Sequence, residues 1–133
     1  MNDMFGEVVY SYSYQDALDD GTFIDVSTMA KECGISFPVA VTANLQLSYL
    51  LPSEQAKQVS QTYDGRLWDV LWMFRNAAKK SSGNRIEFEV LFANGPLTDG
   101  EKGREIVKLI ASCGPRSIEN PEPVITIFLP EDD

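Results

Sequence analysis

The strongest periodic pattern in the sequence is an apolar stripe between residues 64 and 80. Apolar side chains recur there at spacings of three and four, the period of one buried helical face: Leu67, Val70, Leu71, Phe74, Ala77 and Ala78. Lys79 and Lys80 suit the negative end of a helix dipole, and the run Ser81-Ser82-Gly83 ends the pattern. The pattern therefore predicts a helix over Asp64–Lys80.

After residue 84 the period changes from that of a helix to that of strands. Residues 85–92 and 105–113 alternate between apolar and polar positions, and residues 123–129 are apolar at almost every position. The segment Asn94–Gly103 is rich in Gly, Pro and Asp, which is typical of a turn. Because the connections are short, we expect these three strands to form an antiparallel meander.

The first half of the chain contains shorter elements, each begun by a residue that can cap a helix. We expect Ser13 to cap a helix ending near Asp19 and Gly21, Ser27 to cap Thr28–Cys33, Thr42 to cap Ala43–Leu51, and Ser53 to begin a helix towards Ser60. Residues 7–10 form a short apolar opening, and residues 22–25 and 37–41 are extended. Pro38 lacks a backbone donor, so the strand at 37–41 is predicted to lie at a sheet edge.

These elements predict an α+β fold in a single domain, residues 1–133. Its three-stranded antiparallel sheet, a meander in the C-terminal half, packs against one long helix. Short N-terminal helices and an edge strand complete the prediction. Hydrophobic residues make up 44% of the chain, a composition typical of folded proteins.

The net charge of the chain limits the kinds of molecule that it can bind. The chain has 11 Lys and Arg against 20 Asp and Glu, a net charge of −9. Residues 1–60 carry eight acids and two bases, and residues 119–133 carry five acids and no base. Binding to a phosphate backbone needs neutralising cations, so we expect no direct nucleic-acid binding. The acidic ends are explained most simply as a solvated surface, and alternatively as a face that docks on a basic partner.

The cysteine count and the N-terminal segment suggest a compartment. Cys33 and Cys113 are too few for the disulfide framework of a small secreted domain. Residues 1–7 lack a basic region followed by an apolar one, and the apolar runs are far shorter than a membrane span. We therefore expect a cytoplasmic protein with no membrane partner.

The absence of histidine disfavours much of catalysis and metal binding. A calcium loop centred on Gly21 fails, because Leu18 and Ser27 stand where ligands belong. A phosphate loop after Gly95 fails, because Glu101 replaces the required lysine. Cys113 follows an apolar strand, as an inert core thiol would. We predict a protein that is not an enzyme, with no catalytic residue, cofactor or metal ligand.

One metal site stays open at this stage. Glu87 and Glu89 share a face of one predicted strand, and Glu105 lies on the next, so these carboxylates could hold magnesium. The alternative is a solvated sheet face on which Arg85 and Lys108 pair with the acids. The second interpretation requires no ligand.

A second stripe on the long helix gives the main candidate interaction residues: Trp68, Trp72, Arg75 and Lys79. Aromatic rings alternating with bases can stack a nucleotide or hold a partner's side chain. The simpler interpretation is that a wide apolar face buries both indoles under the N-terminal segment, with Arg75 over one ring. The sequence leaves both interpretations open.

Three stretches together carry a resemblance: residues 16–27, 37–42 and 65–72, supported by Cys113-Gly114-Pro115 and residues 122–130. The chain resembles an uncharacterised family of small acidic proteins found in bacteria, plasmids and phages. The resemblance implies a mobile-element context, in which small acidic proteins often bind host machinery. It supplies no activity and no catalytic residue.

The leading hypothesis is a non-catalytic, protein-binding protein of mobile-element type. One alternative is an anti-defence inhibitor that mimics nucleic acid through its acidic ends, for which Asp16, Asp19 and Asp20 are candidate contacts. Another is a small nucleotide-binding or sequestering protein that uses the aromatic and basic helix stripe. A homodimer is also predicted, because Val124, Thr126 and Phe128 would be unusually apolar for a water-facing sheet surface.

Overall fold

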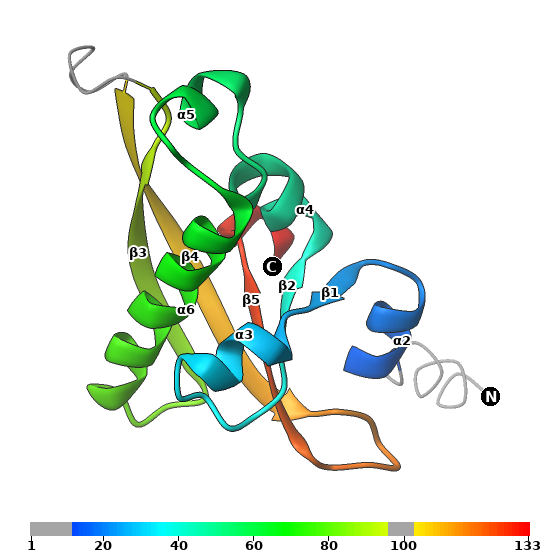
Figure 1. Ribbon diagram of the computed structural model, residues 1–133. Coiled ribbons are helices and arrows are strands. Elements are labelled where there is room, and N and C mark those ends of the chain that lie inside the picture. Colours follow the sequence, from blue (N-terminus) through cyan, green and yellow to red (C-terminus); the bar gives the residue numbers. More distant parts are fainter. Residues whose placement is uncertain (1–11, 96–102) are drawn as a thin grey trace.

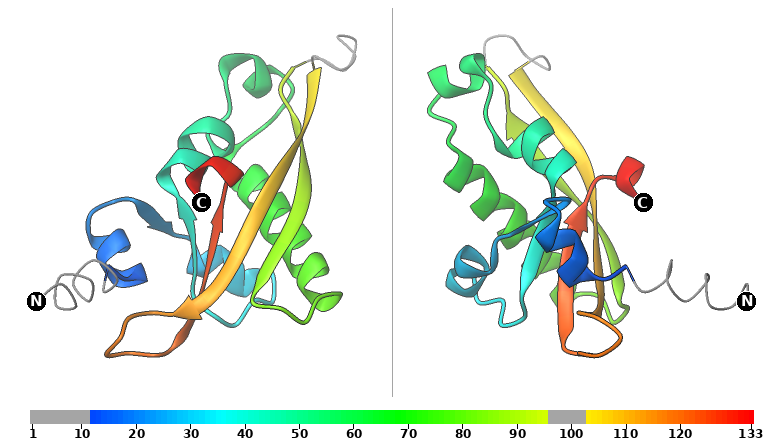
Figure 2. Two further views of the ribbon diagram at one scale, coloured as in Figure 1. Left: turned by 180° about the vertical axis from the view of Figure 1, so that it is seen from behind. Right: turned by 90° about the vertical axis from the view of Figure 1, so that its right-hand side faces the viewer.

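The computed structural model describes residues 12–95 and 103–133. Five strands form one mixed sheet in the order β1-β2-β5-β4-β3. Helices α3, α4, α5 and α6 are packed on one side of this sheet, and α2 lies beside β1 (Figures 1 and 2). The strands are β1 (Phe23–Asp25), β2 (Val39–Thr42), β3 (Arg85–Ala93), β4 (Arg104–Pro115) and β5 (Pro123–Phe128), and the helices are α2 (Tyr14–Asp19), α3 (Ser27–Glu32), α4 (Ala43–Leu45), α5 (Glu54–Gln58) and α6 (Tyr63–Lys79).

The α+β class is confirmed, but the three-stranded antiparallel sheet is wrong. The predicted meander exists, since β3 pairs antiparallel with β4 and β4 with β5. The sheet continues beyond it, because β2 pairs parallel with β5 and β1 pairs antiparallel with β2. Alternation of apolar residues specifies which face of a strand is buried and says nothing about a neighbour 86 residues away, so the parallel pair has no local signature.

The predicted edge strand at 37–41 is also wrong. β2 lies between β1 and β5, and all four of its residues are buried. Pro38 precedes the strand instead of interrupting it, and contributes only its carbonyl oxygen, which accepts a 2.9 Å hydrogen bond from the Ile125 amide. A proline at this position removes no hydrogen bond from the ladder.

Three of the four predicted helix starts in the first half of the chain match the structure and one does not. Ser13, Thr42 and Ser53 accept the expected capping bond through their side chains. Ser27 is instead the first residue of α3, and its hydroxyl donates to the Asp25 carboxylate at 2.5 Å. The predicted helix over 43–51 is short α4 followed by a π-helix, Gln46–Leu50. The apolar opening at residues 7–10 lies outside the described residues.

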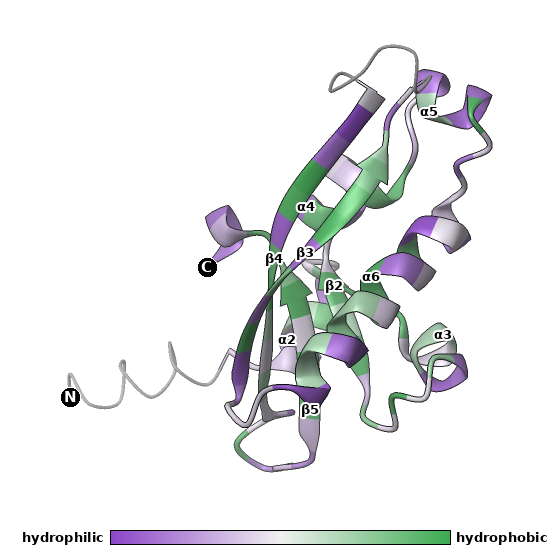
Figure 3. Ribbon diagram, turned by 90° about the vertical axis from the view of Figure 1, so that its left-hand side faces the viewer, coloured by the Kyte–Doolittle hydropathy of each residue, from purple (hydrophilic) through white to green (hydrophobic). Residues whose placement is uncertain are grey.

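The main core lies between α6 and the sheet. Leu67, Val70, Leu71 and Phe74 of α6 are buried against the alternate residues of β3 and β4 that face the helix. Phe74 meets Phe88 with ring centroids 6.0 Å apart. The alternation of hydrophobic and hydrophilic positions along β3 and β4 is visible in Figure 3. Removing these apolar faces from water stabilises the contact by about 25 cal/mol per Å² buried.

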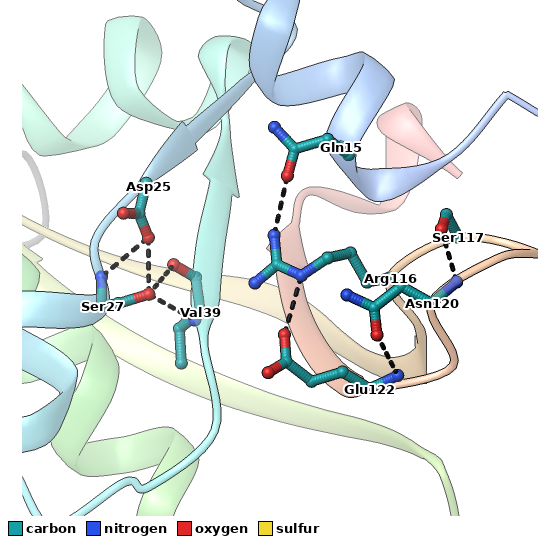
Figure 4. Close-up of polar contacts among 8 residues, drawn as sticks. All are labelled: Gln15, Asp25, Ser27, Val39, Arg116, Ser117, Asn120 and Glu122. Atoms are coloured by element: carbon teal, nitrogen blue, oxygen red, sulfur yellow. Dashed lines mark hydrogen bonds and ion pairs between the residues drawn. The ribbon is translucent and has the colours of Figure 1, made fainter.

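Helix α2 covers the other face of the sheet near β1. Tyr14 packs with Ala40 and Val124 in a second, smaller cluster. Arg116 stacks on the Tyr14 ring and links Gln15 of α2 to Glu122 (Figure 4). Val124 is thus covered from within the chain, and Phe128 is buried beneath Arg85. The apolar excess of β5 therefore no longer argues for a homodimer, which stays an untested prediction.

Tyr14 carries an unsatisfied hydroxyl. The ring is buried, and the hydroxyl finds no hydrogen-bond partner among residues 12–95 and 103–133. Burial, together with the nearby Asp25 carboxylate, raises the pKa of Tyr14 to about 12. The neutral phenol is therefore the form that the fold accepts.

We expect Tyr14→Phe to be neutral or stabilising, by up to about 2 kcal/mol, because a buried unsatisfied hydroxyl costs about 1–3 kcal/mol. The unfolded phenol ionises near pH 10, so the wild type loses stability as the pH rises from about 10 towards 12, whereas the variant has no phenol there to ionise. The difference in urea midpoint should widen over that range. A variant destabilised by more than about 1 kcal/mol at pH 7 would show that the hydroxyl has a partner.

Arg66 joins α6 to two other segments. Its buried guanidinium donates 2.6 Å hydrogen bonds to the carbonyls of Tyr49 and Ala93, and a third bond to the Asn94 side chain. The cation also lies 5.1 Å from the centroid of the Phe92 ring. Two backbone carbonyls and two side-chain amide oxygens, and not a contacting carboxylate, satisfy this cation. The N-terminal end of α6 is thereby fixed to the end of β3 and to the π-helix.

Replacing Arg66 by Met should lower the free energy of unfolding by about 2–4 kcal/mol, because two partly buried carbonyls and two side-chain oxygens lose their donor. Urea denaturation measures the effect. Arg104→Met is the matched control, since Arg104 is exposed on β4 and should shift stability by about 0.5 kcal/mol or less. A similarly small effect at Arg66 would contradict its role as a link between segments.

Candidate functional site

The two tryptophans of α6 are on the surface. Trp68 is 38% exposed and Trp72 is 42% exposed, and their rings are stacked with centroids 6.3 Å apart and an interplanar angle of 9°. The interpretation that a wide apolar face buries both indoles is therefore wrong. The buried face is centred on Val70, Leu71 and Phe74, and the tryptophans lie on its flank.

Arg75 extends the tryptophan stack by one turn. Its Cζ lies 5.2 Å from the centroid of the Trp72 ring, as the sequence predicted for an arginine over an indole. Because Trp68 precedes Trp72 by four residues and Arg75 follows it by three, the Trp72 ring has a neighbour towards each end of the helix. We call Trp68, Trp72 and Arg75 the α6 stack.

Gly34, just after α3, makes room for the arginine. A Cβ at this position would lie 3.2 Å from Arg75 Nε, and Gly34 has a φ of +88°. Glycine is the residue that tolerates both this backbone conformation and the close approach. The guanidinium is therefore held between the Trp72 ring and the end of α3.

A pocket of about 380 Å³ adjoins the α6 stack at the C-terminal end of α6. Arg75 and Lys79 line it, so the pocket includes the two basic members of the predicted stripe. No Asp or Glu is among its lining residues. The other lining residues are small, apolar or hydroxyl- and amide-bearing: Gly34, Ile35, Ser36, Phe37, Phe74, Ala78, Gly83, Asn84, Ile86, Ala111, Ser112, Cys113 and Ile125.

The two cysteines differ in their surroundings. Cys33 is buried in the main core, and burial raises the pKa of its thiol. Cys113 is half-buried and lines the pocket. Both thiols are free, and the inert character expected for Cys113 stays a prediction.

The acidic candidates lie away from this surface. Helix α2 carries Asp16 and Asp19, with Asp20 at its end, on the side of the sheet remote from α6 (Figure 1). Asp16 accepts a hydrogen bond from the Ser13 amide, and Asp19 accepts one from Gln15. Asp20 accepts bonds from the Tyr12 hydroxyl and the Thr22 amide, and the first of these lowers its pKa. These carboxylates stabilise the local structure by accepting hydrogen bonds, and so does Asp25 beside Ser27.

The three carboxylates considered for magnesium do not converge. Glu87 forms a 3.0 Å ion pair with Lys108, and Glu105 accepts bonds from Tyr49 and Asn94 at the far end of the hairpin. Among the described residues there is no group of three or more Cys, Asp or Glu side chains that could hold a metal ion. The rejected phosphate-loop alignment at Gly100 and Glu101 falls outside the described residues.

The comparisons with known proteins identify a family. The model described as "Family of unknown function (DUF6573)" matches residues 1–133. The chain belongs to this family. The resemblance to an uncharacterised family is thus confirmed, while an origin in bacteria, plasmids or phages stays a prediction. No curated protein and no solved structure matches the chain. In the described ranges, no helix is sufficiently long and apolar to cross a membrane.

Sequence reasoning found the stack and missed the pocket. The lining comes from the segment after α3, the end of α6, and strands β3, β4 and β5, which only the tertiary fold brings together. A weak signal existed in the small residues Ala78, Gly83 and Ala111, which leave space between larger neighbours. Such a signal cannot be distinguished from ordinary core packing without the topology.

Because Trp72 is on the surface, Trp72→Ala should lower the free energy of unfolding by only about 1 kcal/mol, the contribution of its two stacking contacts. The neighbouring Leu71→Ala is the matched control, since Leu71 is fully buried and should cost about 2–5 kcal/mol. Urea denaturation of both variants provides the measurement. A loss of about 3–5 kcal/mol at Trp72 would restore the interpretation as a core residue.

Proposed function

We propose that this protein is a non-catalytic binding protein that docks a protein partner on the outer face of α6. The observation that carries the proposal is the α6 stack, two exposed tryptophans with an arginine over the second. Tryptophan and arginine are the residues most enriched among those that dominate binding energy at interfaces.

The stack is pre-organised for binding. Its side chains stand on a 17-residue helix whose opposite face is anchored in the main core, so little backbone order has to be created on docking. Mutual stacking restricts both indoles, and the contact at Gly34 restricts Arg75. A partner that covered these rings would gain apolar burial at a low cost in side-chain entropy.

The alternatives have weaker support. A nucleotide could stack on the outer face of Trp68, but Trp72 already has Trp68 and Arg75 as neighbours. A nucleic-acid mimic would use acidic side chains, but Asp16 and Asp20 accept hydrogen bonds within the chain. The mobile-element setting is a proposal that comes from the family resemblance alone, and the anti-defence role is a proposal that rests on the acidic ends of the chain.

The test compares Trp72→Ser with Met73→Ser. Met73 is 41% exposed on the same helix but on the other flank, so the two variants lose similar exposed apolar groups at adjacent positions. Each protein is immobilised and used to capture partners from an extract of its native cell. The affinity of each captured partner, once purified, is then measured. We expect Trp72→Ser to weaken binding roughly 30-fold or more, the size typical of a dominant interface residue, and Met73→Ser to leave it unchanged.

Two results would contradict the proposal. One is a partner that binds the wild type and Trp72→Ser equally well, because the stack would then lie outside the interface. The other is saturable quenching of tryptophan fluorescence by AMP that is lost in Trp68→Ser, which would favour the nucleotide alternative. Circular dichroism of each variant confirms that the fold is kept.

A further inference from the structure

The pocket at the C-terminal end of α6 has the lining and volume of a ligand-binding site, a role separate from the docking of a protein on the α6 stack. Its walls are mainly apolar, with Phe74 and Ala78 from α6 and Ile86, Ala111 and Ile125 from the sheet. A volume of about 380 Å³ is within the range of small-molecule sites. An apolar cavity of about 150 Å³ holds benzene, so there is room here for a ring and a polar group.

The charges around the pocket have one sign. The chain carries 20 acids and 11 bases, yet the pocket is lined by two bases and no acid. Among the described residues, the ion pairs are made by Lys57, Arg85, Lys108 and Arg116. Arg75 and Lys79 are thus free of ion pairs within the part of the chain that the structure describes. Two uncompensated cations beside an apolar wall favour an anion with an apolar body.

Of the two cationic side chains that would bind the anion, one is held in position. Arg75 is held by the Trp72 ring and by the close approach of Gly34, and a positioned guanidinium suits a carboxylate better than a mobile one. Lys79 adds a flexible second cation one turn later. Ser36, Asn84 and Ser112 add uncharged polar groups to the lining.

We propose that this pocket binds an organic carboxylate with an apolar side chain. The apolar part occupies the space between Phe74, Ile86 and Ile125, and the carboxylate lies at Arg75 and Lys79. Two sources share this chemistry, a free aromatic or aliphatic acid and the C-terminal residue of another polypeptide. The experiment therefore includes one arm for each source.

The first arm titrates ¹⁵N-labelled protein with N-acetyl-L-phenylalanine and with N-acetyl-L-phenylalaninamide, which differ only in the terminal group, a carboxylate in the first and a neutral amide in the second. We expect the acid to shift the amide signals of Gly34, Gly83 and Ser112, and to bind about tenfold or more tightly than the amide. Raising the salt concentration should weaken the acid alone.

Lys79→Gln and Lys80→Gln form the matched pair of variants. Both remove one exposed cation from the end of α6, but only Lys79 lines the pocket. The affinity for the acid should fall about three- to tenfold in Lys79→Gln and stay unchanged in Lys80→Gln. Equal affinities for acid and amide, equal effects of the two variants, or shifts confined to another surface would overturn the proposal.

Alkylation of Cys113 gives a second readout. This half-buried thiol lines the pocket, whereas Cys33 is buried in the core, so iodoacetamide should modify Cys113 first. We expect N-acetyl-L-phenylalanine to slow that modification and the amide to have little effect. Unchanged alkylation at a saturating concentration of the acid would place the ligand elsewhere.

The second arm uses a tetrapeptide ending in phenylalanine, with a free or an amidated C-terminus. Tighter binding of the free peptide than of N-acetyl-L-phenylalanine assigns the pocket to a polypeptide C-terminus, and equal binding assigns it to a small acid. This result is independent of the protein-docking test, because Lys79→Gln leaves Trp68 and Trp72 in place. If the carboxylate does not bind, the docking proposal is unaffected. If the docking test fails, the carboxylate proposal is unaffected.

Discussion

The burial of one face of α6 determines which of its other side chains lie on the surface of the molecule. Leu67, Val70, Leu71 and Phe74 are held against the sheet, and the 3.6-residue period then fixes the direction of every other side chain on the helix. Trp68, Trp72 and Arg75 fall on one flank as a consequence. The proposed docking surface is thus a by-product of core packing, and its rigidity derives from that of the core.

The parallel pairing of β2 with β5 supplies the other half of the site. It places the chain between α3 and β2, with Gly34, Ile35 and Phe37, beside the end of α6. A sheet limited to the predicted meander would leave that side of the pocket without a wall. The same pairing places Ala40 where α2 can cover it, so the two faces of the sheet are closed by elements far apart in sequence.

Local patterns predicted the local structure well. The helix α6, the three C-terminal strands, and the caps at Ser13 and Thr42 follow from periodicity and capping chemistry, which act over a few residues. The parallel neighbour of β5 has no such local signature. The edge-strand prediction from Pro38 was wrong because a proline removes a ladder hydrogen bond only when it lies within the strand, and not when it lies just before it. The sequence left the burial of the two tryptophans open, because an apolar flank and an apolar core face have the same period.

The candidate site likewise has features that local spacing predicts and features that only the tertiary fold creates. Sequence spacing placed Trp68, Trp72, Arg75 and Lys79 together, because residues three and four apart on a helix are neighbours. It could not join Lys79 to Cys113 or Ile125, which reach the pocket only through the fold of the sheet. Nor could it show that Asp16 and Asp20 are occupied by bonds to Ser13 and Thr22.

The two tryptophans of α6 form an exposed pair, with Arg75 over the second ring, on a strongly acidic protein. The chain has two tryptophans, so its tryptophan fluorescence comes from this pair alone. The most direct measurement is quenching of that fluorescence in the native protein by iodide and by caesium at equal ionic strength. We expect both ions to reach the indoles, and iodide to quench more strongly because Arg75 lies on the Trp72 ring. Emission unaffected by either ion, or quenched more by caesium as the net charge of −9 alone would dictate, would contradict this expectation.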